Sequence, residues 1–147
     1  MNDEEFLRQF ETAAWPLADW HHKQHIKIAY LYLRRYPFDE AMTRLRERIK
    51  AYNNAQGIPD APTRGYHETM TGAWLRLVHL TMCEYGPAAT ADEFWERSPQ
   101  LSEKKILRLF YSRELSMSPR AKVEFVEPDL GPFPTSRRQS DETAPGA

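Results

Sequence analysis

Several features that often point to a protein's location or partners are scarce in this chain of 147 residues. The one cysteine, Cys83, excludes a disulfide within the chain and is typical of a reducing compartment, so we expect a cytoplasmic protein. No apolar run approaches the ~20 residues that span a bilayer, and the acidic first residues do not resemble a signal peptide. We therefore expect no membrane partner.

An excess of charge of either sign is also missing. The chain has 20 Lys and Arg residues and 21 Asp and Glu residues, which gives a formal net charge of −1. It therefore has no global basic field and no polybasic run, the usual signs of a protein that binds nucleic acid. The basic residues around Arg44 and Arg48 alternate with acids, so we expect no nucleic-acid partner. The oligomeric state is left open.

Helical spacing of apolar residues dominates what the sequence does contain, and no segment shows the alternation of a strand. The length favours one domain with a sizeable core, and prolines and glycines separate the helical segments. We predict an all-α, single-domain helical bundle of about six to seven helices over residues 1–127. Residues 128–147 are predicted to form an extended, disordered tail, because their last part has no large apolar residue.

Two segments that carry histidines, residues 20–25 and 65–69, are the most informative feature. Each is predicted to open a long helix, over about residues 19–35 and 66–84. His22 and His25 are three residues apart, so they are neighbours on one helix surface, ~5–6 Å apart at Cβ. His67 would add a third imidazole from the second of these helices. Three protein ligands plus water form the usual open coordination of a catalytic metal.

The three histidines therefore predict a divalent metal site. Zinc is the first expectation because the ligands are imidazoles, and iron or manganese is the alternative if a carboxylate joins them. An H-x-x-H pair also arises by chance, and a single histidine on an apolar stripe is often structural. A pocket without metal, used for acid–base chemistry or binding, stays open as an alternative.

Two carboxylates and three aromatic side chains complete the predicted site. Glu11 borders the apolar side of the first helix, and Glu68 follows His67, so either is a candidate for the catalytic proton carrier. Glu11 is equally well explained as a surface acid, and Glu68 as a first-turn acid that complements the helix dipole. The residues expected to contact substrate are Trp20, Tyr66 and Trp74. For Trp74 a place in the core is the competing interpretation.

The motifs Trp20-x-His22-x-x-His25 and Gly65-Tyr66-His67-x-Thr69 occur here in one order, with a proline break at Pro37 between them. This order resembles a family of small, largely uncharacterised bacterial all-helical proteins, and the resemblance extends to about residue 134. It implies that His22, His25 and His67, with Glu11 and Glu68 behind them, form the functional group. It implies no reaction and no substrate.

Three functions compete at this point. The first is a small all-α metalloprotein that acts as a hydrolase or lyase on a small molecule. The second is a module that binds a small molecule or a metal without catalysis, in which Arg64 or Arg76 meets an anion. The third is an interaction protein whose histidines are structural.

Overall fold

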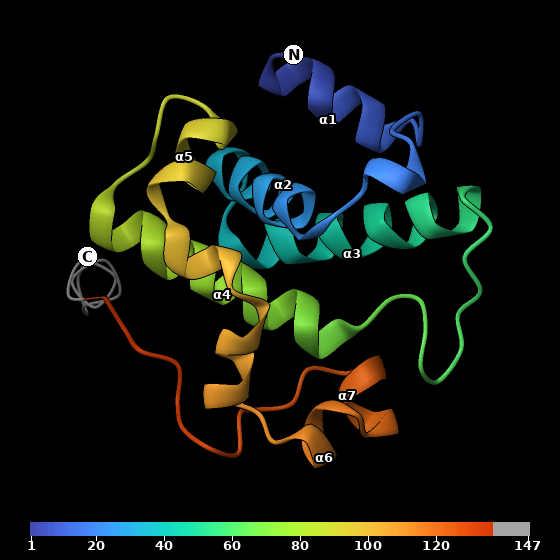
Figure 1. The fold of residues 1–147 in the computed structure, drawn as a ribbon, viewed down its shortest axis with the longest axis vertical. Coiled ribbons are helices and arrows are strands. Elements are labelled where there is room, and N and C mark those ends of the chain that lie inside the picture. Colours follow the sequence, from blue (N-terminus) through green and yellow to red (C-terminus); the bar gives the residue numbers. More distant parts are fainter. Residues whose placement is uncertain (137–147) are drawn as a thin grey trace.

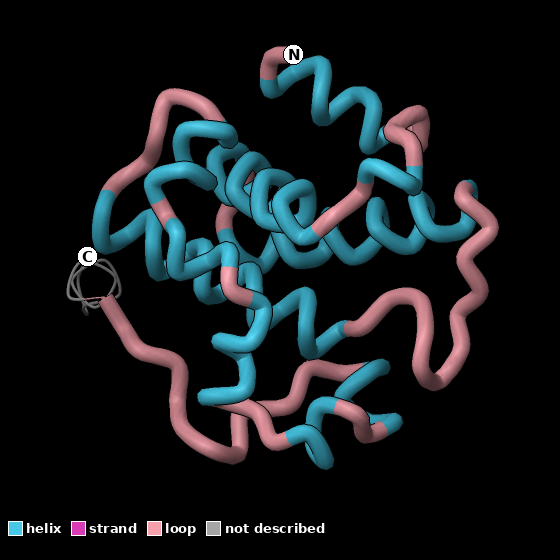
Figure 2. Tube along the Cα trace, in the orientation of Figure 1, coloured by secondary structure: helices cyan, strands magenta, loops and turns pink. Residues whose placement is uncertain are grey.

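The computed structural model describes residues 1–136, and within them it contains seven α-helices, three short 3-10 helices and no strand (Figures 1 and 2). The all-α prediction is confirmed. In chain order the elements are α1 (Asp3–Glu11), η1 (Leu17–Asp19), α2 (His22–Arg35), α3 (Phe38–Ala55), α4 (Glu68–Tyr85), α5 (Ala91–Arg97), η2 (Pro99–Ser102), η3 (Lys104–Leu109), α6 (Arg113–Ser116) and α7 (Pro119–Val123).

Helix α2 lies at the centre of the bundle. It packs against α3, α4 and α5, and all its residues from Ile26 to Tyr32 are buried. A stretch of helix that is buried on every side must be surrounded by other helices, and its one charged residue, Lys27, pairs with Asp92 of α5 at 3.0 Å. Helix α1 crosses one end of the bundle and adds Phe6, Leu7 and Phe10 to the same core (Figure 1). Within residues 1–136, no helix combines the length and the apolar character that crossing a bilayer requires.

The starts of α2 and α4 fix the positions of the predicted site residues. The backbone N–H of His21 donates to the side chain of Gln24 at 2.9 Å, which makes His22 the first residue of α2. His67 is the N-cap of α4. Both segments therefore open long helices, as their sequences predict.

The apolar residues Ile106, Leu107 and Phe110 have helical spacing, which predicts a continuous helix over residues 101–111. The chain after α5 differs from this prediction. It forms the short 3-10 helices η2 and η3, which are separated at Glu103. The side chain of Glu103 accepts a hydrogen bond from the backbone N–H of Lys105, and this starts a new turn instead of continuing the old one. The segment that includes α6 and α7 then passes beside the start of α4 (Figure 1).

Residues 128–136 are extended, as predicted for the tail, but they pack on the fold. The ring of Phe133 lies 4.9 Å from that of Phe110, centre to centre. The buried Ser136 donates from its hydroxyl to Glu84 Oε2 at 2.8 Å, near the end of α4. These contacts explain why this stretch needs no regular secondary structure. The prediction of disorder also covers residues 137–147, which lie outside the described residues.

Candidate functional site

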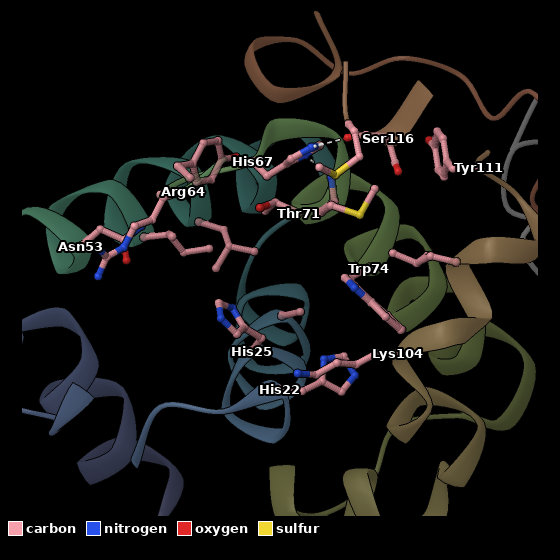
Figure 3. Close-up of a pocket in the computed structure, with 18 of the residues that line it drawn as sticks. His22, His25, Asn53, Arg64, His67, Thr71, Trp74, Lys104, Tyr111 and Ser116 are labelled. Carbon is pink, nitrogen blue, oxygen red and sulfur yellow. Dashed lines mark hydrogen bonds between the residues drawn. The ribbon is translucent and has the colours of Figure 1, made fainter. Parts of the chain in front are cut away.

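A cavity of about 1280 Å³ lies between α2, α3, α4 and the chain that follows η2. It brings together residues from both histidine segments (Figure 3). Six of the eight predicted site residues line it: Trp20, His22, His25, Tyr66, His67 and Trp74. Glu11 and Glu68 do not. The starts of α2 and α4 therefore meet at one cavity.

His22 is anchored by one of its two ring nitrogens. Its Nε2 lies 2.7 Å from the carbonyl oxygen of Leu101, which can only accept a hydrogen bond. The proton therefore sits on Nε2, and Nδ1 carries the lone pair. Burial lowers the pKa of His22, and the positive charge of Lys104 lowers it further, while the Leu101 carbonyl acts in the opposite direction. His22 is thus an oriented, neutral imidazole at pH 7.

His25 receives a hydrogen bond instead. The indole Nε1–H of Trp20 donates to His25 Nε2 at 2.8 Å, so in the neutral ring the proton is on Nδ1. The surrounding protein lowers the pKa of His25 to about 4, and the neighbouring His22 and Lys104 act in the same direction. The ring nevertheless stays accessible to water, because it lines the cavity.

His67 uses both ring nitrogens in contacts within the protein. Its Nδ1 accepts from the backbone N–H of Met70 at 3.1 Å, and its Nε2 donates to the carbonyl oxygen of Ser116 at 2.9 Å (Figure 3). The first bond caps α4, and the second joins α4 to α6. Burial lowers the pKa of His67, as does the charge of Lys122. This imidazole therefore connects parts of the fold.

These bonds determine how well the three histidines suit a shared metal. A metal takes the lone pair of each imidazole, but the lone pairs of His25 and His67 already accept N–H groups. His67 also lies across the cavity from His22 and His25 in Figure 3. Among residues 1–136 there is no cluster of three or more His, Cys, Asp or Glu side chains that could hold a metal ion. The shared metal stays a prediction that requires both hydrogen bonds to break.

Glu68 turns away from the cavity toward α3. Its carboxylate accepts two hydrogen bonds from Arg46, at 2.9 and 2.7 Å, and one from the Tyr66 hydroxyl at 2.6 Å. Burial alone would raise the pKa of Glu68, but the hydrogen bonds from Arg46 and Tyr66 lower it overall. Glu68 is therefore ionised and bonded to Arg46 and Tyr66. In this arrangement it does not reach the cavity, where the predicted proton transfer would occur.

Glu11 lies in a different part of the molecule. It borders a separate surface hollow of about 290 Å³ between the end of α1, α2 and α3. Its carboxylate is 3.6 Å from Nε of Arg48. The structure thus agrees with the alternative interpretation of Glu11 as a surface acid, and it gives Glu11 no contact with the histidines.

The three predicted substrate contacts, Trp20, Tyr66 and Trp74, all line the cavity, but they differ in burial and in the residues that they contact. Trp20 stacks on Phe10 with 5.0 Å between ring centres, so one face belongs to the core. Tyr66 is 7% exposed, and its hydroxyl is bonded to Glu68. Trp74 is half-buried and meets the ring of His22 edge-on at 4.6 Å. Trp20 and Trp74 are thus both partly exposed, whereas Tyr66 is buried.

Among residues 1–136, four cationic side chains also line the cavity, and no Asp or Glu does. They are Arg64, Lys104, Arg108 and Arg113. All four are exposed, and none has a carboxylate within 4.0 Å among residues 1–136. Arginines on α3 differ, because Arg44, Arg46 and Arg48 pair with glutamates. The cavity is thus positively charged in a chain whose net charge is −1.

Of the two arginines proposed to meet an anion, only Arg64 lines the cavity. Arg76 instead lies over the ring of Phe125 at 3.8 Å and donates to the carbonyl oxygen of Gly72. The contributions of Lys104, Arg108 and Arg113 were not anticipated from the sequence. A signal was present, since residues 104–113 contain four basic residues and no acid. The apolar spacing of residues 101–111 predicts a helix, but it does not show that the basic residues face a cavity.

Two helix starts thus supply neutral imidazoles and aromatic walls. Two other segments, the loop with Arg64 and residues 104–113, supply positive charge that no carboxylate of residues 1–136 pairs with. The resemblance to a bacterial family stays a prediction. Comparisons of the chain with models of protein families, with curated proteins and with solved structures found no match.

Proposed function

We propose that the protein binds a small anionic molecule with an apolar, ring-bearing body in this cavity. The observation that supports the proposal concerns the described residues 1–136: four cations line the hollow, no carboxylate pairs with them, and none lines the hollow. A cavity with walls of one charge sign concentrates ligands of the opposite sign. The metal alternative has less support, because those cations would repel a metal ion and two of the three imidazole lone pairs are in use.

The rest of the lining suits the body of such a molecule. Leu45, Ile49 and Met70 line the cavity with apolar surface, as does the indole of Trp74. A few polar groups, including the side chains of Asn53 and Thr71, are placed among them. Ligand sites in proteins typically combine mostly apolar walls with a small number of polar groups that set orientation. Apolar contact would supply affinity, and the cations would select for negative charge.

A matched pair of fluorescent probes tests this proposal. 8-Anilinonaphthalene-1-sulfonate carries a sulfonate, whereas N-phenyl-1-naphthylamine has the same ring system and no charge. We expect the sulfonate to bind at least tenfold more tightly at low salt, and its affinity to fall as salt screens the cations. Quenching of tryptophan fluorescence would report the same binding event, since Trp20 and Trp74 line the cavity.

Charge-removing variants locate the binding. The triple variant Lys104→Gln, Arg108→Gln, Arg113→Gln should lose most of the preference for the sulfonate. Its control replaces three other exposed cations by Gln, namely Arg34, Arg35 and Lys105, none of which lines the cavity. The control changes net charge equally and should keep the preference. Equal binding of both probes, or equal loss in both triple variants, would refute the proposal.

Acid–base catalysis on the bound molecule is a second candidate, and the geometry of His22 favours it. The Leu101 carbonyl holds Nε2–H and leaves Nδ1 as a base with a lowered pKa. Hydrolysis of a panel of anionic aryl esters by the wild type and by His22→Gln tests this role. Turnover that persists unchanged in the variant would exclude His22 as the base.

Elemental analysis of protein purified without a histidine tag tests the metal alternative. A stoichiometric metal that is lost in His25→Ala and in His67→Ala would establish the three-histidine site. It would also mean that the bonds from Trp20 and Met70 give way on metal binding. We expect no stoichiometric metal, because both bonds are formed in this structure.

A further inference from the structure

The four cations of the cavity come from two separate segments. Arg64 belongs to the loop between α3 and α4, whereas Lys104, Arg108 and Arg113 lie on η3 and at the start of α6. Figure 3 shows Arg64 beside Asn53 on one side of the hollow and Lys104 beside His22 on another, with His25 between them. The charge of Lys104 acts on His22 and His25, which agrees with its place at that end.

The loop that carries Arg64 is held firmly in place. The backbones of Ala61 and Arg64 exchange two hydrogen bonds, at 3.1 and 3.0 Å. Gly65 has φ +91°, and a Cβ there would lie 3.0 Å from the carbonyl oxygen of Pro59, so the turn requires glycine. Arg64 therefore projects from a turn with little backbone freedom.

The same loop is tied to the C-terminal part of the fold through Lys122 on α7. Its Nζ donates to Asp60 Oδ1 and to the carbonyl oxygen of Tyr66, both at 2.6 Å. The Lys122 side chain is 11% exposed and that of Asp60 is 77% exposed, so only the lysine end of this bridge is shielded from water. The contact also lowers the pKa of Asp60 and occupies that carboxylate, and no carboxylate among residues 1–136 pairs with Arg64.

The second group of cations is anchored as well. The backbone N–H and the hydroxyl of Ser112 donate to the carboxylate of Asp129, at 2.8 and 2.6 Å. The Tyr111 hydroxyl donates to the carbonyl oxygen of Val126 at 2.8 Å. These contacts fix residues 111–112 between Arg108 and Arg113. Asp129 is occupied by Ser112, and it does not pair with either arginine.

A ligand with one anionic group can meet only one of these two anchored charge groups. We infer that the cavity selects an elongated aromatic dianion, with one anionic group at Arg64 and the other at Lys104, Arg108 and Arg113. The inference rests on the proposed function and specifies its ligand class. Because the backbone near both charge groups is held in place, a dianion of matching length gains the second contact at the cost of ordering only the side chains that meet it.

Three naphthalene carboxylates distinguish the effect of the distance between two anionic groups from the effect of total charge. 2-Naphthoate has one carboxylate, naphthalene-2,6-dicarboxylate has two at opposite ends, and naphthalene-1,8-dicarboxylate has two at the same end. Isothermal titration calorimetry at pH 7.5 should give a dissociation constant about fivefold or more lower for the 2,6-isomer than for either other compound. That factor corresponds to one additional partly exposed ion pair.

Arg64→Gln should remove this advantage, so that the variant binds the 2,6-isomer and 2-naphthoate with dissociation constants within about twofold of each other. The matched control is Arg34→Gln, an exposed arginine outside the cavity, and it should retain the advantage. If the anilinonaphthalene sulfonate binds but the 2,6-isomer shows no advantage, the inference fails and the proposed function survives. If no anionic compound binds better than its neutral counterpart, the proposed function itself fails.

Discussion

The starts of α2 and α4 look alike in sequence but have different roles in the structure. Both place histidines and aromatic residues on the wall of one cavity. At α4, Tyr66, His67 and Glu68 all use their polar atoms in hydrogen bonds within the fold. At α2, His22 keeps Nδ1 free of any hydrogen bond within residues 1–136. The comparison shows that histidines at similar positions can be structural in one helix and available in another.

The strongest test of this difference is Glu68→Gln. The change keeps the size of the side chain, but it removes the charge that accepts two hydrogen bonds from Arg46. The Glu68 side chain is only 12% exposed, and hydrogen bonds to charged groups contribute about 1.5–3 kcal/mol. We expect the free energy of unfolding to fall by about 2 kcal/mol, as measured by urea denaturation.

The matched control is Glu11→Gln. Glu11 lies 3.6 Å from Arg48 at the surface, and such exposed pairs contribute about 0–1 kcal/mol. Its replacement should leave the urea midpoint nearly unchanged. Equal losses in the two variants would contradict the assignment of Glu68 as the structural acid of the pair.

The next largest effect is expected for His67→Ala. The variant loses the cap on Met70 N–H and the bond to the Ser116 carbonyl. Loss of an N-cap typically costs about 0.5–2 kcal/mol, so we expect a decrease of about 1.5 kcal/mol in unfolding free energy. His67→Asn is the control, because asparagine can cap α4 but is too short to take the place of Nε2 at Ser116. The unfolding free energy of His67→Asn should lie between those of the wild type and His67→Ala. If His67→Asn is as unstable as His67→Ala, the cap on α4 contributes nothing.

Stability should also depend on pH through the histidines. Folding lowers the pKa values of His22, His25 and His67 below the ~6.5 of an unfolded chain. At a pH between the folded and the unfolded pKa values, the unfolded chain binds more protons than the folded one. The free energy of unfolding therefore keeps its full value above about pH 6.5 and falls as the pH drops toward 4. Urea midpoints at pH 7.5 and 5.5 measure this loss. His25→Asn should reduce it most, since the pKa of His25 is lowered to about 4; an unchanged pH dependence would contradict this.

A smaller effect on stability than for Glu68→Gln or His67→Ala is expected for Trp20→Phe. The variant removes the indole N–H that donates to His25, and water in the cavity can take its place, so the cost should stay below about 1 kcal/mol. The pKa of His25 should rise from about 4, because the hydrogen bond that favours the neutral ring is lost. Proton NMR titration of the His25 ring measures this rise. Trp95→Phe, beside His22, is the control and should leave His25 unaffected.

Local features of the sequence were sufficient to predict the helices that carry the site. The apolar spacing of α2 and α4, and the breaks at Pro37 and Gly86, depend on residues within a few positions of one another. The same local reasoning failed for residues 101–111. There the Glu103 side chain bonds to the backbone and separates two 3-10 helices, a contact that apolar spacing does not reveal.

The availability of each imidazole nitrogen depends on distant backbone groups. His22 meets a carbonyl 79 residues away, and His67 meets one 49 residues away. A pattern such as H-x-x-H gives the type of side chain but not its hydrogen-bond partner, and the partner determines which lone pair is left for a ligand. The predicted metal site needs a lone pair from each of three imidazoles. The sequence does not show which of these lone pairs already accept a hydrogen bond.

The sequence by itself determined the helical class and the presence of histidines and aromatic residues at two helix starts, since these follow from local spacing and side-chain chemistry. Only the tertiary structure decided that Glu68 pairs with Arg46, that Glu11 lies elsewhere, and that Arg64 shares a cavity with the cations of residues 104–113. The physical reason is that a carboxylate or a guanidinium takes its role from the charges around it. Those neighbours come from segments that meet only when the chain packs around α2.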